Sequence, residues 1–168
     1  MCGITAIFSS QQQSDRLISS LHKMLLHRGP DHQNFIHINL ENHRHLYLLH
    51  NRLSIVDLTN AGHQPMHDQT TGVYLIFNGE IYNFREIRQI LETEGFVFQS
   101  NTDSEVLLKG YIHWGKDVVQ KLNGMFAFIV WDSRAQKMFV ARDRFGEKPL
   151  YYGKAKNGDI IFSSEIKS

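Results

Sequence analysis

A cysteine directly after the first methionine is the residue with the most distinctive chemistry in this sequence. Cys2 is the only cysteine among 168 residues. A small second residue favours removal of Met1, which would give Cys2 a free α-amine beside its nucleophilic thiol. An α-amine has a reference pKa of about 7.7–8.0, so it can serve as the general base for its own thiol. The alternative is that Cys2 is a small buried hydrophobic residue, like many free cysteines.

The pair Asn78–Gly79 stands between the apolar run Val-Tyr-Leu-Ile-Phe and the segment Glu-Ile-Tyr. Asn-Gly in such a setting is typical of a tight hairpin turn. The same pair would also present a side-chain amide and a backbone N–H to an oxyanion formed during acyl transfer. Glycine suits that role because a ligand can approach its backbone closely. The residues alone leave both interpretations open.

Three charged residues have a binding interpretation and an ordinary one. Arg52 ends a strand-like segment, and its planar guanidinium could bind a carboxylate with two hydrogen bonds. Asp103, in the first turn of a predicted helix, and Glu80, beside the Asn-Gly pair, could accept hydrogen bonds from a substrate ammonium. A surface ion pair, a favourable helix-dipole contact and simple solvation are the alternatives.

Three helices are predicted from capping residues and apolar spacing. Ser14 caps the first helix, which Gly29–Pro30 ends. Its apolar positions follow a helical period: Leu17, Ile18, Leu21, Met24 and Leu25. Capping boxes, Asn83 with Glu86 and Thr102 with Glu105, predict the other two helices. The inner face of the second helix is expected to hold Phe84, Ile87, Ile90 and Leu91.

Short apolar segments predict strands around these helices. They cover residues 2–8, 35–38, 45–49, 73–77, 125–131, 137–142, 150–153 and 159–163, with a further short apolar run at 53–56. The segment Met125–Trp131 is apolar on both alternating faces, so neither face should meet water. Short connections favour antiparallel pairing. We therefore expect one α+β domain over 1–168, with two stacked antiparallel sheets flanked by helices.

Composition excludes several classes of function. The net charge of +1 offers no electrostatic case for binding nucleic acid or an anionic membrane. The first residues lack a signal peptide, and no stretch approaches about 18 apolar residues. A single cysteine suits the reducing cytoplasm. The ten histidines have generic spacings and form no HExxH motif, so no metal site is expected.

Eight motifs, in order along the whole chain, carry a resemblance to one enzyme family. They are Met-Cys-Gly-Ile at 1–4, His-Arg-Gly-Pro-Asp at 27–31, Arg-Leu-Ser-Ile-Val-Asp at 52–57, Gly-His-Gln-Pro-Met at 62–66, Asn-Gly-Glu-Ile-Tyr-Asn at 78–83, Thr-Asp-Ser-Glu at 102–105, Gly-Met-Phe-Ala-Phe at 124–128 and Arg-Asp-Arg-Phe-Gly-Glu-Lys-Pro-Leu-Tyr-Tyr at 142–152. The chain resembles the glutaminase domain of class II glutamine amidotransferases, specifically that of glutamine-hydrolysing asparagine synthetases.

The resemblance implies a four-layer αββα sandwich, the N-terminal nucleophile (Ntn) hydrolase fold. It implies that Cys2 attacks the side-chain amide of L-glutamine and that Asn78 and Gly79 hold the oxyanion. The residues that it assigns to substrate binding are Arg52 for the α-carboxylate, Asp103 and Glu80 for the α-ammonium, and Leu53, Ser54, Ile55 and Val56 for the pocket wall. It assigns no chemistry to the His-Arg-Gly-Pro-Asp motif.

The resemblance also implies what lies outside these residues. No Walker-type phosphate motif occurs here, so ATP and Mg²⁺ are expected only in an absent synthetase domain, which would follow in the same chain or be separate. This domain should need no cofactor. Two alternatives stay open: a glutaminase that feeds another acceptor, in sugar, antibiotic or cell-envelope amidation, and a non-catalytic domain that keeps Met1. The oligomeric state is open, with a homodimer among the alternatives.

Overall fold

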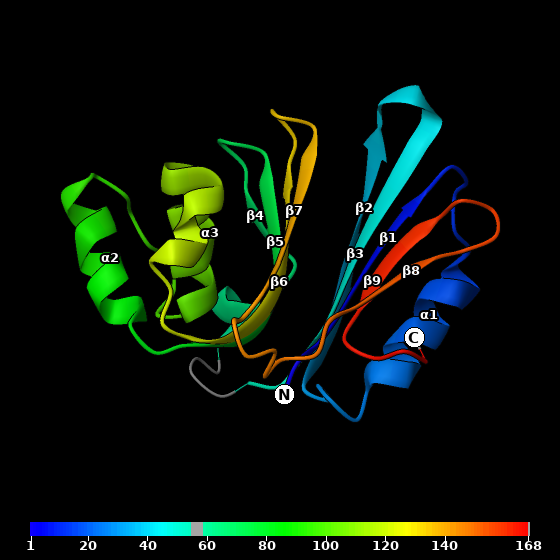
Figure 1. Cartoon of the computed structure of the whole chain (residues 1–168), viewed down its shortest axis with the longest axis horizontal. Helices are drawn as coiled ribbons and strands as arrows, with labels where there is room; N and C mark the ends of the chain where they lie inside the picture. Colours follow the sequence, from blue (N-terminus) through cyan, green and yellow to red (C-terminus); the bar gives the residue numbers. More distant parts are fainter. Residues whose placement is uncertain (55–58, 168) are drawn as a thin grey trace.

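Two antiparallel sheets lie face to face at the centre of the computed structural model, which describes residues 1–54 and 59–167 (Figure 1). The first sheet has the strand order β2 (His32–Leu40), β3 (Arg44–Arg52), β1 (Gly3–Ser9), β9 (Ile160–Ser163) and β8 (Tyr151–Lys154). The second has the order β4 (Met66–Asp68), β5 (Val73–Ile81), β6 (Gly124–Asp132) and β7 (Lys137–Arg142).

Helices cover the outer face of each sheet. Helix α1 (Asp15–Leu25) lies on the first sheet, helix α3 (Asp103–Trp114) lies on the second, and helix α2 (Phe84–Thr93) packs beside α3 (Figure 1). Three short 3₁₀ helices complete the described elements, at Glu41–His43, Asn60–Gly62 and Gly115–Gln120. The order of layers is helix, sheet, sheet, helix, so the predicted four-layer αββα sandwich is confirmed.

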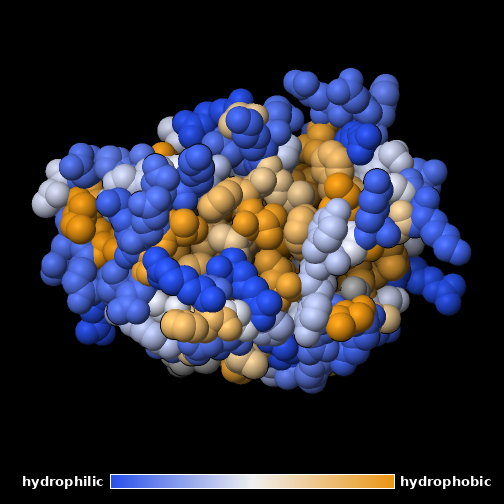
Figure 2. All heavy atoms as spheres, in the orientation of Figure 1, coloured by the Kyte–Doolittle hydropathy of each residue, from blue (hydrophilic) through white to orange (hydrophobic). Residues whose placement is uncertain are grey.

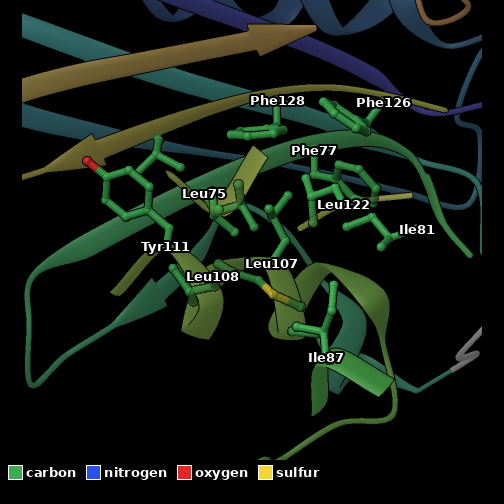
Figure 3. Close-up of a cluster of buried hydrophobic side chains, with 14 of the residues drawn as sticks. Leu75, Phe77, Ile81, Ile87, Leu107, Leu108, Tyr111, Leu122, Phe126 and Phe128 are labelled. Carbon is green, nitrogen blue, oxygen red and sulfur yellow. The ribbon is translucent and has the colours of Figure 1, made fainter. Parts of the chain in front are cut away.

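Each pair of neighbouring layers encloses apolar side chains. Between the two sheets lie Ile4, Ala6, Leu46, Leu48, Ile76, Ala127, Ile129 and Trp131. In the largest cluster, leucines of α3 meet phenylalanines of β5 and β6 (Figure 3). Because both faces of β6 are covered, its continuous apolar run is explained. In the space-filling view, hydrophobic residues gather between the sheets, while the flanking helices present mostly hydrophilic ones (Figure 2).

Two of the three predicted helix caps are confirmed. The Ser14 side chain accepts from Leu17 N, and the Thr102 side chain accepts from Glu105 N. At the start of α2 the prediction is wrong, because Asn83 makes no side-chain cap bond. Its side chain instead bonds Lys121 O and Asn123 N, which ties the start of α2 to the chain before β6.

The strand predictions differ from the structure mainly in length and at one site. Strand β7 has its predicted bounds, β2 is longer at both ends, and β4 was not predicted. The predicted end of a strand at Asn78–Gly79 is wrong, because β5 continues through this pair to Ile81. In the helices, Leu17, Met24 and Ile90 are exposed, so the buried stripes are narrower than the periodicity indicated.

Candidate active site

A cavity of about 150 Å³ opens beside the N-terminus, and seven of the predicted site residues line it. They are Cys2, Arg52, Leu53, Asn78, Gly79, Glu80 and Asp103. These residues come from the first residues of the chain, the end of β3, the second half of β5 and the start of α3. The fold therefore assembles in one cavity residues that lie as far apart in the sequence as Cys2 and Asp103.

Cys2 is half-buried, and its thiol contacts the backbone of Leu53. The Sγ atom lies 3.4 Å from Leu53 N, which donates to it, and 3.7 Å from Leu53 O. Burial raises the pKa of the Cys2 thiol, while the Leu53 hydrogen bond and the charges of the N-terminus and Arg52 oppose that rise. Because β1 begins at Gly3 and Arg28 Nε donates to Cys2 O at 3.0 Å, the backbone of this residue is fixed at the cavity wall.

Strand β5 extends beyond its neighbour β4, and this leaves part of one edge without a strand partner. The β4 pairing ends at Leu75. Beyond that point, Phe77 N donates to the Gln64 side chain at 2.6 Å, and Ile81 N donates to Asp103 Oδ2 at 3.0 Å. Because alternate N–H groups of a strand point the same way, the N–H of Gly79 lies between these two bonds and points away from β6.

The side chain of Asn78 supplies a second donor in the same lining. Asn78 is 1% exposed. Its Nδ2 has no hydrogen-bond partner among the described residues, although it is fully buried. A buried donor without a partner costs roughly 1–3 kcal/mol, which a ligand oxygen would relieve. Asn78 and Gly79 therefore present two donors to the cavity from consecutive residues of one strand.

Gly79 is required for a reason other than a turn. A side chain there would collide with the backbone of β6, including Phe126 Cα at 2.7 Å from the added Cβ. The hairpin interpretation of Asn78–Gly79 is therefore wrong. The glycine is explained by the close approach of β6.

Arg52 is buried at the end of β3, with its guanidinium in the cavity lining. Its Nη1 donates to Thr59 O at 2.9 Å. The backbone of Gly62 approaches the guanidinium so closely that a Cβ there would strike it. The surface ion pair considered above is excluded, because Arg52 is only 5% exposed.

Asp103 and Glu80 contribute two carboxylates. Asp103 is buried at the start of α3, and Glu80 is exposed at the cavity edge. Burial, together with the Glu80 charge, raises the pKa of Asp103 to about 6, although the bond from Ile81 N opposes the rise. The carboxylates can therefore receive a cationic group opposite the Arg52 guanidinium.

Some predicted residues lie elsewhere, and some lining residues were not predicted. Ser54 lies outside the lining, where its N donates to Asp31 Oδ2 at 2.7 Å. Ile55 and Val56 fall outside the described residues. Gln64 and Lys148 line the cavity, although the sequence analysis contains them only within motifs and assigns them no role. Their chemistry gave no signal in the sequence, because a glutamine and a lysine near prolines suit any exposed loop.

The described residues offer neither a metal site nor a membrane-spanning helix. No group of three or more His, Cys, Asp or Glu side chains in residues 1–54 and 59–167 is arranged to hold a metal ion. No helix in the same ranges is long and apolar enough to span a membrane.

Comparisons with known proteins agree over the whole length. The family described as "glutamine amidotransferase domain" matches residues 1–168. Glutamine-hydrolyzing asparagine synthetase 1 of Bacillus subtilis is 40% identical over 173 residues, which cover 100% of this chain and 26% of that protein. Amidase chry2 of Gibberella zeae is 37% identical over 181 residues, with 100% and 26% covered. The chain thus spans about a quarter of the length of these relatives.

Solved structures agree on the fold. A glutamine phosphoribosylpyrophosphate amidotransferase from B. subtilis, complexed with ADP and GMP, matches with a TM-score of 0.79 at 21% identity, covering 98% of this chain and 42% of that chain. A structure titled as the allosteric regulatory enzyme of purine biosynthesis has a TM-score of 0.77 at 22% identity, with the same coverage. The sandwich is the Ntn hydrolase fold. With the family match over every residue, the chain belongs to the glutamine amidotransferase domain family.

Proposed function

We propose that this domain, residues 1–168, hydrolyses the side-chain amide of L-glutamine to glutamate and ammonia through a thioester on Cys2. The observation that carries the proposal is the buried, unpartnered Nδ2 of Asn78 in the same cavity as the Cys2 thiol. An unpaired donor beside a nucleophile is the arrangement that acyl transfer needs.

In the first half of the reaction, Cys2 Sγ attacks the side-chain carbonyl carbon of glutamine. The carbonyl oxygen becomes an oxyanion that Asn78 Nδ2 and Gly79 N stabilise. The α-amine of Cys2, freed by loss of Met1, accepts the thiol proton and passes it to the amide nitrogen. The C–N bond breaks, and ammonia leaves.

In the second half, water attacks the γ-glutamyl thioester on Cys2. The same α-amine accepts a proton from the water, and the same two donors hold the second oxyanion. The C–S bond breaks, which releases glutamate and restores the thiol. One pair of donors and one base serve both halves, because the two tetrahedral intermediates carry their charge at the same oxygen.

The remaining cavity residues recognise the amino-acid end of the substrate. Arg52 binds the α-carboxylate through its guanidinium, while Asp103 and Glu80 bind the α-ammonium. Leu53 completes the described part of the wall. Free glutamine carries both charges, so this set distinguishes it from a glutamine residue inside a peptide.

The ammonia is proposed to feed an ATP-dependent asparagine synthetase domain, since the relative with 40% identity carries that name and is about four times as long. ATP and Mg²⁺ would bind there, and this domain would use no cofactor. A second candidate is delivery to another acceptor, which the similarity to a protein named amidase chry2 favours. We place the protein in the reducing cytoplasm, without a nucleic-acid or membrane partner; a homodimer is compatible.

The test begins with the mass of the purified chain, which reports whether Met1 has been removed. Processed protein should release glutamate and ammonia from L-glutamine in equal amounts, and Cys2→Ala should bind glutamine without cleaving it. Ser19→Ala, at an exposed position of α1 away from the cavity, is the matched control and should keep most of the turnover. Glutamate release by Cys2→Ala, or none by processed wild type, would overturn the proposal. To identify the acceptor of the ammonia, protein that includes the proposed synthetase domain is given L-glutamine, ATP and aspartate. Formation of asparagine would identify aspartate as the acceptor.

A further inference from the structure

Lys148 is a buried cation in the Cys2 cavity that the proposed mechanism leaves without a role. It is 6% exposed and lies in the cavity lining. Its Nζ lies 3.3 Å from Met1 Sδ. None of the salt bridges found among the described residues includes it. Burying an ammonium group without a carboxylate partner costs free energy of folding, so the presence of Lys148 at this position needs an explanation.

The loop after β7 holds the backbone of Lys148 at both ends. Lys148 N donates to Asp143 Oδ2 at 3.0 Å, and Lys148 O accepts from Arg142 Nε at 2.8 Å. The Asp143 carboxylate also accepts from the backbone N–H groups of Phe126, Phe145 and Glu147. Burial acts against these bonds, but together they hold the pKa of Asp143 below its ordinary value. The loop is therefore built around one ionised carboxylate, which fixes where Lys148 enters the cavity.

Covalent geometry limits the distance between Lys148 and the reactive amine. Met1 Sδ is joined to the nitrogen of Cys2 by a short path through the Met1 side chain and carbonyl carbon. With the measured 3.3 Å from Nζ to Sδ, the ammonium lies within roughly 10 Å of that nitrogen. Loss of Met1 removes the contact of Lys148 and leaves both amines facing the same cavity.

We propose that Lys148 is a positioning residue of this active site, whose fixed positive charge keeps the thiol and the α-amine of Cys2 in their singly protonated, reactive state. The inference rests on the proposed function. The reactive pair carries one proton, shared as thiol with neutral amine or thiolate with ammonium. A nearby cation disfavours the doubly protonated pair, so the second proton is lost to solvent at a lower pH.

The other charged side chains around the thiol and α-amine of Cys2 have oppositely charged partners once glutamine binds. Arg52 on β3 takes the substrate carboxylate, and Asp103 on α3 and Glu80 on β5 take its ammonium. On the remaining side, after α1, Arg28 lies 3.3 Å from Glu165. The rings of His32 and His63 stack near Arg52 with their centroids 3.5 Å apart, and burial lowers the pKa of each. Lys148 is thus the cavity cation that neither the substrate nor a described carboxylate matches.

The experiment is the pH dependence of glutamate release by Lys148→Met, Lys148→Arg and Lys154→Met. Lys154 is exposed on β8, so its variant removes the same charge away from the cavity. In Lys148→Met, the acidic limb of kcat/KM should move to higher pH by about one unit. Lys148→Arg should restore the limb, and Lys154→Met should match wild type. Each variant is first checked by mass for loss of Met1, because Lys148 contacts that residue.

The outcomes separate this inference from the proposed function. A Lys148→Met limb that stays within 0.2 units of wild type, with turnover lowered equally at all pH values, would reduce Lys148 to a structural residue. That result would leave the glutaminase intact. Absence of glutamate release by processed wild type would instead remove the proposed function, whatever Lys148 does.

Discussion

The unpartnered amide of Asn78 is the single-residue feature on which the proposed chemistry depends most. Its Nδ2 is buried among groups that offer it no hydrogen bond in residues 1–54 and 59–167. Such a donor is costly without a partner, and a substrate oxygen would provide one. Because the oxygen of the tetrahedral intermediate carries more charge than the substrate carbonyl, the gain is greatest at the transition state.

Asn78→Ala and the isosteric Asn78→Asp should therefore lower kcat strongly while the fold is kept. Loss of one oxyanion donor costs about 2.7–4 kcal/mol, or roughly 10²–10³ in kcat. The aspartate variant replaces a donor by an acceptor of the same shape, so it tests hydrogen bonding apart from packing. Steady-state glutamate release and thermal unfolding measure the two effects. Turnover within threefold of wild type in both variants would remove Asn78 from the mechanism.

Asp103 gives substrate binding a predicted pH dependence. Burial raises the pKa of Asp103 to about 6, so below that pH the carboxyl group holds a proton and loses its charge. The affinity of Cys2→Ala for glutamine should fall by about tenfold per pH unit below 6. Calorimetry between pH 7 and 5 measures this. Cys2→Ala that also carries Asp103→Asn should bind glutamine weakly at every pH. If the affinity of Cys2→Ala with Asp103 intact is equally independent of pH, the assignment of Asp103 is contradicted.

At the scale of elements, the overhang of β5 beyond β4 creates the site. The Gln64 side chain and the Asp103 carboxylate take the N–H groups that a neighbouring strand would otherwise take. The site is therefore an interrupted sheet edge closed by side chains. Gly79 lies inside this strand, where glycine is normally unfavourable, because the backbone of β6 approaches it too closely for a side chain.

Gly79→Ala should destabilise the protein because the added methyl group meets β6. Overpacking of this kind costs about 1–3 kcal/mol. Gly153, in strand β8, is a matched control, since a Cβ there meets nothing within 4 Å. Urea unfolding should give a clear loss for Gly79→Ala and little change for Gly153→Ala. Equal stability of the two variants would show that β5 and β6 can separate at this point.

The local elements were predictable where one chain segment decides them. Ser14 and Thr102 cap their helices because the groups they bond lie three residues away. Asn83 does not cap its helix because distant backbone groups at Lys121 and Asn123 compete for its amide. The pair Asn78–Gly79 was mispredicted for a similar reason. The sequence Asn-Gly is compatible with a tight turn and with a strand that continues past its neighbour, and the choice depends on where β4 ends.

At the scale of the molecule, two stacked sheets flanked by helices followed from apolar patterning, above all from the two-faced run of β6, and the four-layer order followed from the family resemblance. The cavity residues did not follow from patterning alone, and their grouping came from motif resemblance. Neither patterning nor resemblance predicted that Gln64 and Lys148 line the cavity. The position of Gln64 depends on where β4 ends, and that of Lys148 depends on the hydrogen bonds of its loop to the Asp143 carboxylate.

His50 joins the two sheets and makes the stability of the sandwich depend on pH. It lies on β3, is fully buried, and its Nε2 donates to Phe77 O of β5 at 3.2 Å. Its other nitrogen, Nδ1, has no partner among the described residues. Burial lowers the pKa of His50 to about 3, because a charged ring between the sheets would have no counter-charge.

The sign of the effect follows from proton binding. Between pH 6.5 and 3 the unfolded chain binds a proton at His50 that the folded protein does not. The free energy of unfolding therefore decreases as the pH is lowered from 6.5 towards 3, by about 1.4 kcal/mol per pH unit from this residue. Asp103 acts in the opposite direction between about pH 4 and 6, where its raised pKa lets the folded protein hold the extra proton. The two contributions partly cancel in that window.

His50→Gln should separate them, since glutamine can still donate to Phe77 O but does not titrate. Urea unfolding between pH 6.5 and 4.5 should give a pH slope smaller than that of wild type by about 1.4 kcal/mol per unit. Asp103→Asn should make the slope steeper between pH 4 and 6, and His43→Gln, at an exposed position, should leave it unchanged. If His50→Gln keeps the wild-type slope, acid reaches the sandwich through other groups, and the bond between β3 and β5 does not govern its opening.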